Sequence, residues 1–161
     1  MIRTMVDKDA ETVLDIYKMG IETGNATFET SVPDWKNWSE KHLKHSRFVF
    51  ENNNSVVGWV VLSAISQRAV YAGVAEVSIY VHPKYFGKQI GSQLMEAVLK
   101  SSEENGIWTL QSSIFPENIA TLKLHEKFGF RIVGMREKIA QLNHIWRNTI
   151  ILERRSKITG N

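Results

Sequence analysis

Two glycines, Gly87 and Gly91, stand between a strand pattern and a helix pattern, where a chain can bind an anion. The strand pattern is A-E-V-S-I-Y-V at 75–81, and it ends before Pro83. The helix pattern begins at Ile90 and continues with apolar residues at the spacing of one helix face. Backbone N–H groups at the start of a helix have no partner within it, and the helix dipole is positive there. The stretch therefore predicts a phosphate-binding turn.

The predicted strand before this turn carries a carboxylate beside two hydroxyl groups. Because side chains alternate along a strand, Glu76, Ser78 and Tyr80 share one face. A carboxylate there can accept a proton from a reacting group, directly or through water. It can also bind an ammonium group by charge alone or orient a neighbouring side chain. The sequence leaves these alternatives open.

A second polar stripe is predicted near the C-terminal third of the chain. Asn118, Thr121 and His125 lie at i, i+3 and i+7 of a helical pattern, so their side chains align. Histidine titrates near neutral pH and can donate or position a proton, although helix histidines are often ordinary hydrogen-bonding residues. Asn118 can equally cap the helix.

The composition predicts one domain spanning residues 1–161. The chain has no cysteine, which excludes disulfides and a cysteine nucleophile and suits a reducing compartment. It shows neither a signal core nor an apolar run of about 20 residues, so we expect a cytoplasmic protein without a membrane partner. The net charge of +3 is too mild to predict nucleic-acid binding, and the five histidines form no metal-ligand pattern, so no metal is expected.

The predicted elements give a mixed sheet with helices on both sides. Along the chain they begin with a strand at 2–5, a helix that starts after Asp7 or Asp9 and ends at Gly20 or Gly24, a helix at 35–45 and a hairpin at 47–64. A strand at 75–81, a helix from 90 to before 106, a strand at 109–115, a helix at 118–128, and two strands near 131–141 and 145–153 follow. The loop that contains Phe28 and Glu29 is a candidate binding loop, although Phe28 also suits the core.

Five segments in this order resemble the GCN5-related N-acetyltransferase (GNAT) superfamily, most closely its phosphinothricin acetyltransferase type. They are A-T-F-E at 26–29, R-A-V-Y at 68–71, A-E-V-S-I-Y-V at 75–81, P-E-N-I-A-T at 116–121 and L-H-E-K-F-G-F at 124–130. The resemblance implies the GNAT fold, an α/β (α+β) fold with a mixed, mostly antiparallel sheet of about seven strands. It also implies direct acetyl transfer from acetyl-CoA to the amino group of a small amino acid or analogue, of the phosphinothricin or methionine sulfone or sulfoximine type.

The resemblance also assigns residues to roles. Glu76 becomes the general base, and His125 the group that donates or positions a proton for the leaving thiolate. Cofactor contacts, including backbone support for the oxyanion, fall on Ile79, Tyr80, Val81, Phe86, Gly87, Lys88, Gln89, Ile90, Gly91, Ser92, Asn118, Thr121 and His125. Substrate contacts fall on Phe28, Glu29, Arg68, Tyr71 and Ser78. Arg68 suits a substrate carboxylate, because its planar guanidinium can engage both oxygens.

The turn F-G-K-Q-I-G departs from the superfamily pattern at two positions. Phe86 replaces a usual polar or cationic residue, and Gln89 stands at the first motif glycine. If the backbone at Gln89 is ordinary helix, its side chain costs little. The backbone donors do not depend on side-chain identity, so we expect cofactor binding to survive. A third departure is Asn148, which replaces the aspartate of a W-x-D segment.

Two other functions remain open at this stage. The departures at Phe86 and Gln89 are compatible with a non-catalytic acyl-CoA-binding or regulatory module. An acetyltransferase acting on a protein N-terminus or a polyamine is the other. The oligomeric state is open as well, and the resemblance makes a homodimer one of the options.

Overall fold

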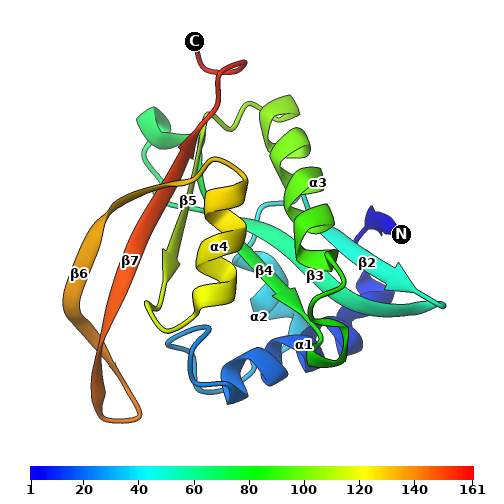
Figure 1. Ribbon diagram of the computed structural model, residues 1–161. Coiled ribbons are helices and arrows are strands. Elements are labelled where there is room, and N and C mark those ends of the chain that lie inside the picture. Colours follow the sequence, from blue (N-terminus) through cyan, green and yellow to red (C-terminus); the bar gives the residue numbers. More distant parts are fainter.

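A computed structural model describes residues 1–161 and contains one seven-stranded sheet with helices on both faces (Figure 1). The strands are β1 (Ile2–Thr4), β2 (Phe48–Asn52), β3 (Ser55–Ala64), β4 (Val74–Val81), β5 (Thr109–Ile114), β6 (Arg131–Leu142) and β7 (Ile145–Arg155). Their order in the sheet is β1-β2-β3-β4-β5-β7-β6, and only β4 and β5 run parallel. The predicted mixed, mostly antiparallel sheet is confirmed.

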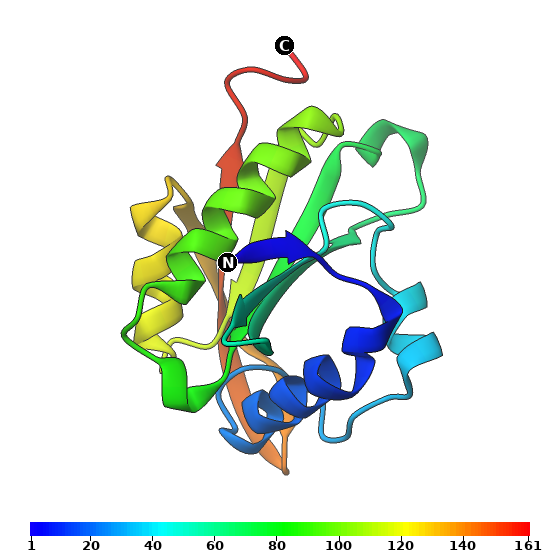
Figure 2. The same ribbon diagram turned by 90° about the vertical axis from the view of Figure 1, so that its right-hand side faces the viewer.

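The helices form two layers on opposite faces of this sheet (Figures 1 and 2). They are α1 (Ala10–Glu22), α2 (Trp35–Glu40), α3 (Ile90–Glu104) and α4 (Ile119–Lys127), with short 3-10 turns η1 (Asp7–Asp9), η2 (Ala69–Tyr71) and η3 (Pro83–Tyr85). None of the helices combines the length and the apolar character needed to cross a membrane.

Each layer has its own hydrophobic core. Ala75 and Val77 of β4 pack in the cluster that contains the buried side chains of α3. The second cluster includes Trp59 and Val61 of β3 with buried residues of α1 and α2. Since side chains alternate along a strand, Glu76 faces the side of α1 and α2.

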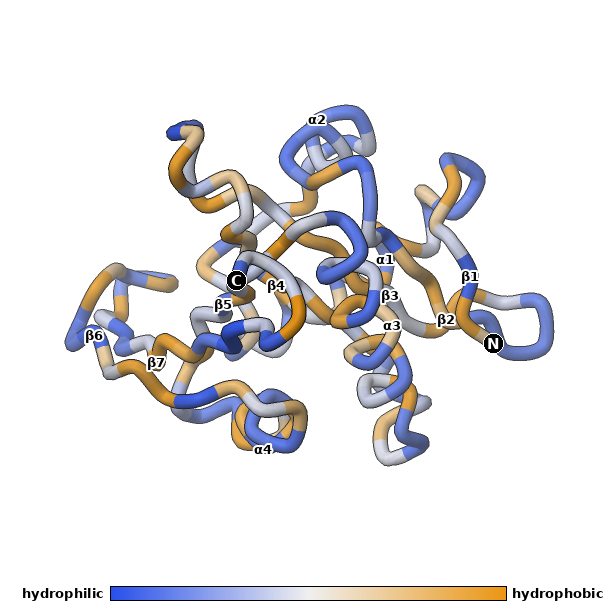
Figure 3. Tube along the Cα trace, turned by 90° about the horizontal axis from the view of Figure 1, so that it is seen from above, coloured by the Kyte–Doolittle hydropathy of each residue, from blue (hydrophilic) through white to orange (hydrophobic).

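Both hairpin turns have the backbone that the strand twist requires. Asn53 and Asn54 have φ of 49° and 62°, and Asn143 and His144 have φ of 51° and 67°. Two consecutive positive φ values are the mark of a type I′ turn, which asparagine tolerates well. The two hairpins predicted from their polar turns are confirmed. The β6–β7 hairpin lies to one side of the fold, with apolar segments along it (Figure 3).

The helix predicted at 35–45 is wrong at its C-terminal end, because α2 ends at Glu40. The Arg47 guanidinium donates to the backbone carbonyls of Ser39, His42 and Leu43 at 2.5, 2.9 and 2.5 Å. These carbonyl groups therefore have an arginine as partner in place of a further helical turn. No local pattern in the sequence predicts this contact.

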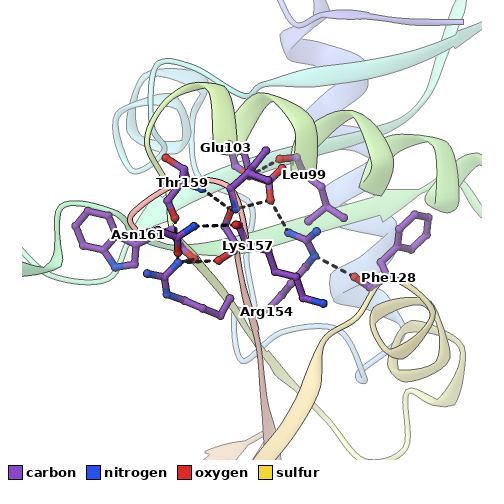
Figure 4. Close-up of polar contacts among 12 residues, drawn as sticks. Leu99, Glu103, Phe128, Arg154, Lys157, Thr159 and Asn161 are labelled. Carbon is purple, nitrogen blue, oxygen red and sulfur yellow. Dashed lines mark hydrogen bonds and ion pairs between the residues drawn. The ribbon is translucent and has the colours of Figure 1, made fainter.

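A partly buried ion pair and a hydrogen bond of the same arginine join the C-terminal ends of α3 and α4 to β7 (Figure 4). Arg154 donates from Nη1 to Glu103 Oε1 at 3.2 Å and from Nε to the Phe128 carbonyl at 3.1 Å. The Ser156 hydroxyl donates to the same Glu103 oxygen at 2.9 Å. The two helices are thus fastened to the sheet at one end.

We expect Arg154→Met to lower the free energy of unfolding by about 1–3 kcal/mol, because it leaves the Glu103 carboxylate with one neutral donor. Glu103 is only 15% exposed, so its charge is poorly solvated. Arg131→Met is the matched control, since Arg131 is 67% exposed in its pair with Glu153 and its loss should cost less than about 1 kcal/mol. Urea unfolding followed by tryptophan fluorescence measures both. Equal losses would contradict this account.

Candidate functional site

The site is organised by a gap in the centre of the sheet. β4 and β5 pair only at Val74–Thr109, Ala75–Leu110 and Glu76–Gln111, and then diverge (Figure 1). The His82 N–H donates to the Val57 carbonyl of β3, so by alternation the peptide groups of Ile79 and Val81, beyond the last pair with β5, face the gap. These peptide groups have no strand partner and can bond an extended ligand.

One large cavity of about 1530 Å³ follows this gap through the sheet. At one end it is lined by residues of the turn before α3 and by α4. At the other it is lined by the loop between α1 and α2 and by residues of β6 and β7. Glu76 and Gln111, the last pair before the strands diverge, line the middle. The cavity therefore connects the two faces of the sheet at a carboxylate.

The turn before α3 presents a series of free backbone donors. From Gly87 through Ser92, no backbone N–H has an intramolecular acceptor. Gly87 has a φ of +76°, which favours glycine, and the helix N-cap is Gln89. Free donors together with the positive end of a helix dipole make this turn suited to a phosphate group.

Gln89 is not in an ordinary helical conformation. Its φ and ψ are 59° and 19°, in the left-handed region that a non-glycine residue enters at a cost of about 1–2 kcal/mol. A small cost for glutamine is expected from the sequence only if this backbone is ordinary helix, and the backbone is not helical. The motif glycine that it replaces is useful here for its backbone freedom.

Asn118 begins α4 and reaches across to another loop. Its Oδ1 accepts from the Thr121 N–H at 3.4 Å, and its Nδ2 donates to the Asn25 carbonyl at 3.2 Å. The capping interpretation of Asn118 is thus correct, and both Asn118 and Thr121 also line the cavity.

A guanidinium from β7 holds this same loop. Arg147 donates to the Gly24 carbonyl and to Asn25 Oδ1, each at 2.8 Å, and lies 4.2 Å from the centre of the Phe115 ring. Phe115 in turn packs edge to face against Phe28 at 4.9 Å. The loop between α1 and α2 is therefore fixed over one end of the cavity.

Both ring nitrogens of His125 are engaged inside the protein. Nδ1 donates to the Thr121 carbonyl at 2.7 Å, so Nε2 is left to accept from the Ser112 hydroxyl at 2.8 Å. The side chain is only 2% exposed, and burial lowers its pKa. A neutral histidine with both nitrogens bonded can position its neighbours, whereas donating a proton would require one of these bonds to break.

Glu76 lies on the opposite face of the sheet from His125. Its half-buried carboxylate accepts from Gln111 Nε2 at 3.4 Å. Burial raises its pKa, while the Gln111 hydrogen bond and the positive charge of Arg136 lower it. The net shift is upward, which brings the carboxylate closer to the pKa of a working base.

The end of the cavity beside α1 is rich in aromatic side chains. Tyr80 stacks on Trp59 at 4.7 Å and meets Tyr17 edge to face at 5.3 Å. Burial raises the pKa of both tyrosines. Gly20 of α1 makes room for Tyr80, because a Cβ at Gly20 would come within 2.4 Å of the tyrosine ring.

Most residues predicted for the site line this one cavity. They are Phe28, Glu29, Glu76, Ser78, Ile79, Tyr80, Val81, Phe86, Gly87, Gln89, Ile90, Gly91, Ser92, Asn118, Thr121 and His125. Three other predicted residues do not line the cavity: Arg68, Tyr71 and Lys88. Arg68 lies over the exposed Tyr71 ring at 5.5 Å, and Lys88 lies over the Tyr85 ring at 5.0 Å.

Several residues that line the cavity were not predicted from the sequence. Lys123 and Lys127 lie one turn apart on α4 and bring positive charge beside the α3 turn, where Lys127 Nζ donates to Ser92 Oγ at 3.2 Å. Their i, i+4 spacing places them on one face of the predicted helix, so the sequence could have indicated this pair of charges. Arg136 and Thr149 also line the cavity, and no motif in the sequence points to either residue. The face of Arg136 depends on the irregular register of β6.

Asn148 has a local role in that irregular strand. Its Oδ1 accepts from the Lys138 N–H at 2.8 Å, within the break in register between Arg136 and Ala140. An amide oxygen accepts this bond as an aspartate oxygen would. The loss of charge at this position therefore leaves the backbone contact in place.

Comparisons with a family model, with curated proteins and with solved structures all point to the same family. The model of the acetyltransferase (GNAT) family matches residues 13–130. YwnH of Bacillus subtilis, named as a candidate phosphinothricin acetyltransferase, is 32% identical over 88% of this chain and 90% of its own length. The L-methionine sulfoximine/L-methionine sulfone acetyltransferase of Salmonella typhimurium is 24% identical over 86% and 84%. The phosphinothricin acetyltransferase of Sinorhizobium meliloti, solved in complex with AcCoA, has a TM-score of 0.87 at 22% identity, covering 100% of this chain and 94% of that one.

We expect Gln89→Gly to raise the free energy of unfolding by up to about 1 kcal/mol, because glycine adopts the left-handed backbone without strain while losing some chain entropy. Gln89→Ala is the matched control and should be no more stable than the wild type, since alanine meets the same steric restriction. Thermal unfolding of the three proteins gives the comparison. Equal gains from glycine and alanine would show that the side chain, rather than the backbone, was unfavourable.

Proposed function

The chain belongs to the acetyltransferase (GNAT) family, and from this premise we propose that it transfers the acetyl group of acetyl-CoA to the amino group of a small amino acid or analogue. The observation that carries the proposal is the position of Glu76. A half-buried carboxylate with a raised pKa lines a cavity that crosses the sheet, so it can meet an amine on one side and a thioester on the other.

The cofactor end of the cavity supports acetyl-CoA as the donor. The free N–H groups from Gly87 through Ser92 suit a pyrophosphate, and the gap-facing peptide groups of Ile79 and Val81 suit the amide-containing pantetheine arm. Lys123 and Lys127 add positive charge at the same end. The solved relative from Sinorhizobium meliloti contains AcCoA.

In the proposed reaction, Glu76 takes a proton from the substrate ammonium, directly or through water. The neutral amine nitrogen then attacks the thioester carbonyl, forming the C–N bond. The carbonyl oxygen becomes an oxyanion that the backbone N–H groups of β4 stabilise without reorganisation. When the intermediate collapses, the C–S bond breaks, the nitrogen gives up its extra proton to become an amide, and this proton is transferred to the departing thiolate, so that CoA leaves as the thiol. Holding amine and thioester in contact supplies a large part of the rate gain.

For His125 we propose a positioning role. Its bonds to Thr121 and Ser112 join α4 to β5, so the histidine fixes the helix that borders the cofactor end. This assignment departs from the thiolate protonation that the family resemblance implies.

Turnover with a panel of acceptors tests the proposed activity. We expect acetyl-CoA-dependent release of CoA with amino acids that include methionine sulfone and phosphinothricin, and little release with polyamines or peptide N-termini. Release above background with none of these amines, together with normal acetyl-CoA binding in calorimetry, would instead favour a non-catalytic module.

The proposed base predicts a specific pH dependence. Because burial raises the Glu76 pKa, kcat/KM should fall as the pH drops through a value above the ordinary glutamate range. Glu76→Gln should lower kcat by about 10²–10⁴-fold and remove this limb, with little change in acetyl-CoA affinity. Glu126→Gln is a matched control on an exposed carboxylate and should leave the profile unchanged. An intact acidic limb in Glu76→Gln would exclude Glu76 as the base.

We further propose that the chain forms a homodimer through the β6–β7 hairpin. Its apolar side chains are about half or more exposed: Ile132, Val133, Met135, Ile139, Ile145 and Trp146. Exposed apolar surface of this kind is typical of an interface. Light scattering should give twice the chain mass, and a Met135→Glu, Ile145→Glu double variant should give one chain mass. A monomeric wild type would overturn the proposal.

A further inference from the structure

We propose that Arg136 and Thr149 form the anion-binding end of the acceptor site and bind the carboxylate of the amino-acid substrate. This inference rests on the proposed function and adds to it the residues that select the substrate. Nothing in the sequence motifs points to either residue.

The register of the sheet places both residues on the face of Glu76. Glu76 is paired with Gln111 on β5, which is paired with Glu153 on β7. Two-residue steps along β7 lead from Glu153 to Thr149 on the same face, and Thr149 is paired with Arg136 on β6. Both residues line the cavity that Glu76 lines.

Thr149 carries an unsatisfied polar atom into this region. The residue is only 4% exposed, and its Oγ1 has no hydrogen-bond partner in the protein. No other buried side-chain nitrogen or oxygen is unpaired. A buried hydroxyl group without a partner is unfavourable, so a ligand oxygen beside it would be stabilised.

Arg136 is the one arginine of β6 and β7 that makes no hydrogen bond or ion pair. The other four have partners: Arg131 pairs with Glu153, Arg147 with Glu117, Arg154 with Glu103, and Arg155 donates to backbone carbonyls of the C-terminal segment. The Arg136 guanidinium is therefore available to a ligand, and its planar donors match the two oxygens of a carboxylate. Its charge also lowers the pKa of Glu76, so the two groups lie within electrostatic reach.

This arrangement matches the two charged groups of an amino acid. The ammonium group would meet the Glu76 carboxylate, and the carboxylate would meet Arg136 with the Thr149 hydroxyl as a second donor. Arg68, for which the family resemblance implies the carboxylate contact, does not line the cavity. The Asn148 contact to the Lys138 N–H secures the irregular segment of β6 that follows Arg136.

Ligand binding tests the inference without requiring turnover. Calorimetry on the CoA-saturated protein compares N-acetyl-L-methionine sulfone, which keeps the carboxylate, with its primary amide, which does not. The wild type should bind the acid at least about tenfold more tightly than the amide. Arg136→Met should abolish this preference, Arg136→Lys should restore part of it, and Thr149→Val should weaken acid binding about threefold or more. Arg131→Met, on the same strand but paired with Glu153, should keep the full preference.

The outcomes separate this inference from the proposed activity. A carboxylate preference that Arg136→Met removes supports the inference even if no amino acid is acetylated. If amino acids are acetylated and Arg136→Met keeps the preference for acid over amide, the inference is overturned while the activity stands. Equal binding of acid and amide by the wild type, or binding of neither, also overturns it.

Discussion

The early end of the pairing between β4 and β5 is the constraint on which the rest of the site depends. Peptide groups inside a sheet normally bond to a neighbouring strand, and leaving them without a partner is costly unless water or a ligand takes its place. Here β3 holds one side of β4 and β7 holds one side of β5, so the two strands stay extended while the space between them opens. The sheet remains intact around an opening that can receive an extended molecule.

The opening also joins two faces of the sheet that carry different chemical groups. The α3 turn and α4 stand on one side with free N–H groups and lysines, which suit a phosphorylated ligand. The opposite side has tyrosines, Phe28 and a carboxylate, which suit a small amine. Glu76 lies at the last paired position, where the two sides meet. His125 lies on the phosphate side and is locked by two hydrogen bonds, which separates its role from that of Glu76.

How much of this could be predicted from the sequence depends on the range of the contacts involved. The β4 alternation, the hairpin turns and the glycine-containing turn are local patterns, and they led to the correct elements and to predicted site residues of which most line the cavity. The end of α2 was missed because Arg47, several residues away, takes the carbonyls that a longer helix would use. Arg136 was missed because a break in the register of β6 decides which way it faces, and Thr149 was missed because no motif marks it, although regular alternation along β7 sets its face. The conformation of Gln89 was missed because side-chain identity favours a different backbone from the one that the turn imposes.

The position of β7 has a consequence for how the protein is made. β7 is the last strand of the chain, yet in the sheet it lies between β5 and β6. During synthesis, β5 is therefore an open edge until β7 has left the ribosome, and an unpaired edge can join another chain. The wall that carries Arg136, Thr149 and Arg147 is likewise incomplete until β7 has formed. A chain that stopped before β7 would have the turn before α3 but neither the wall that carries Thr149 and Arg147 nor a protected sheet edge.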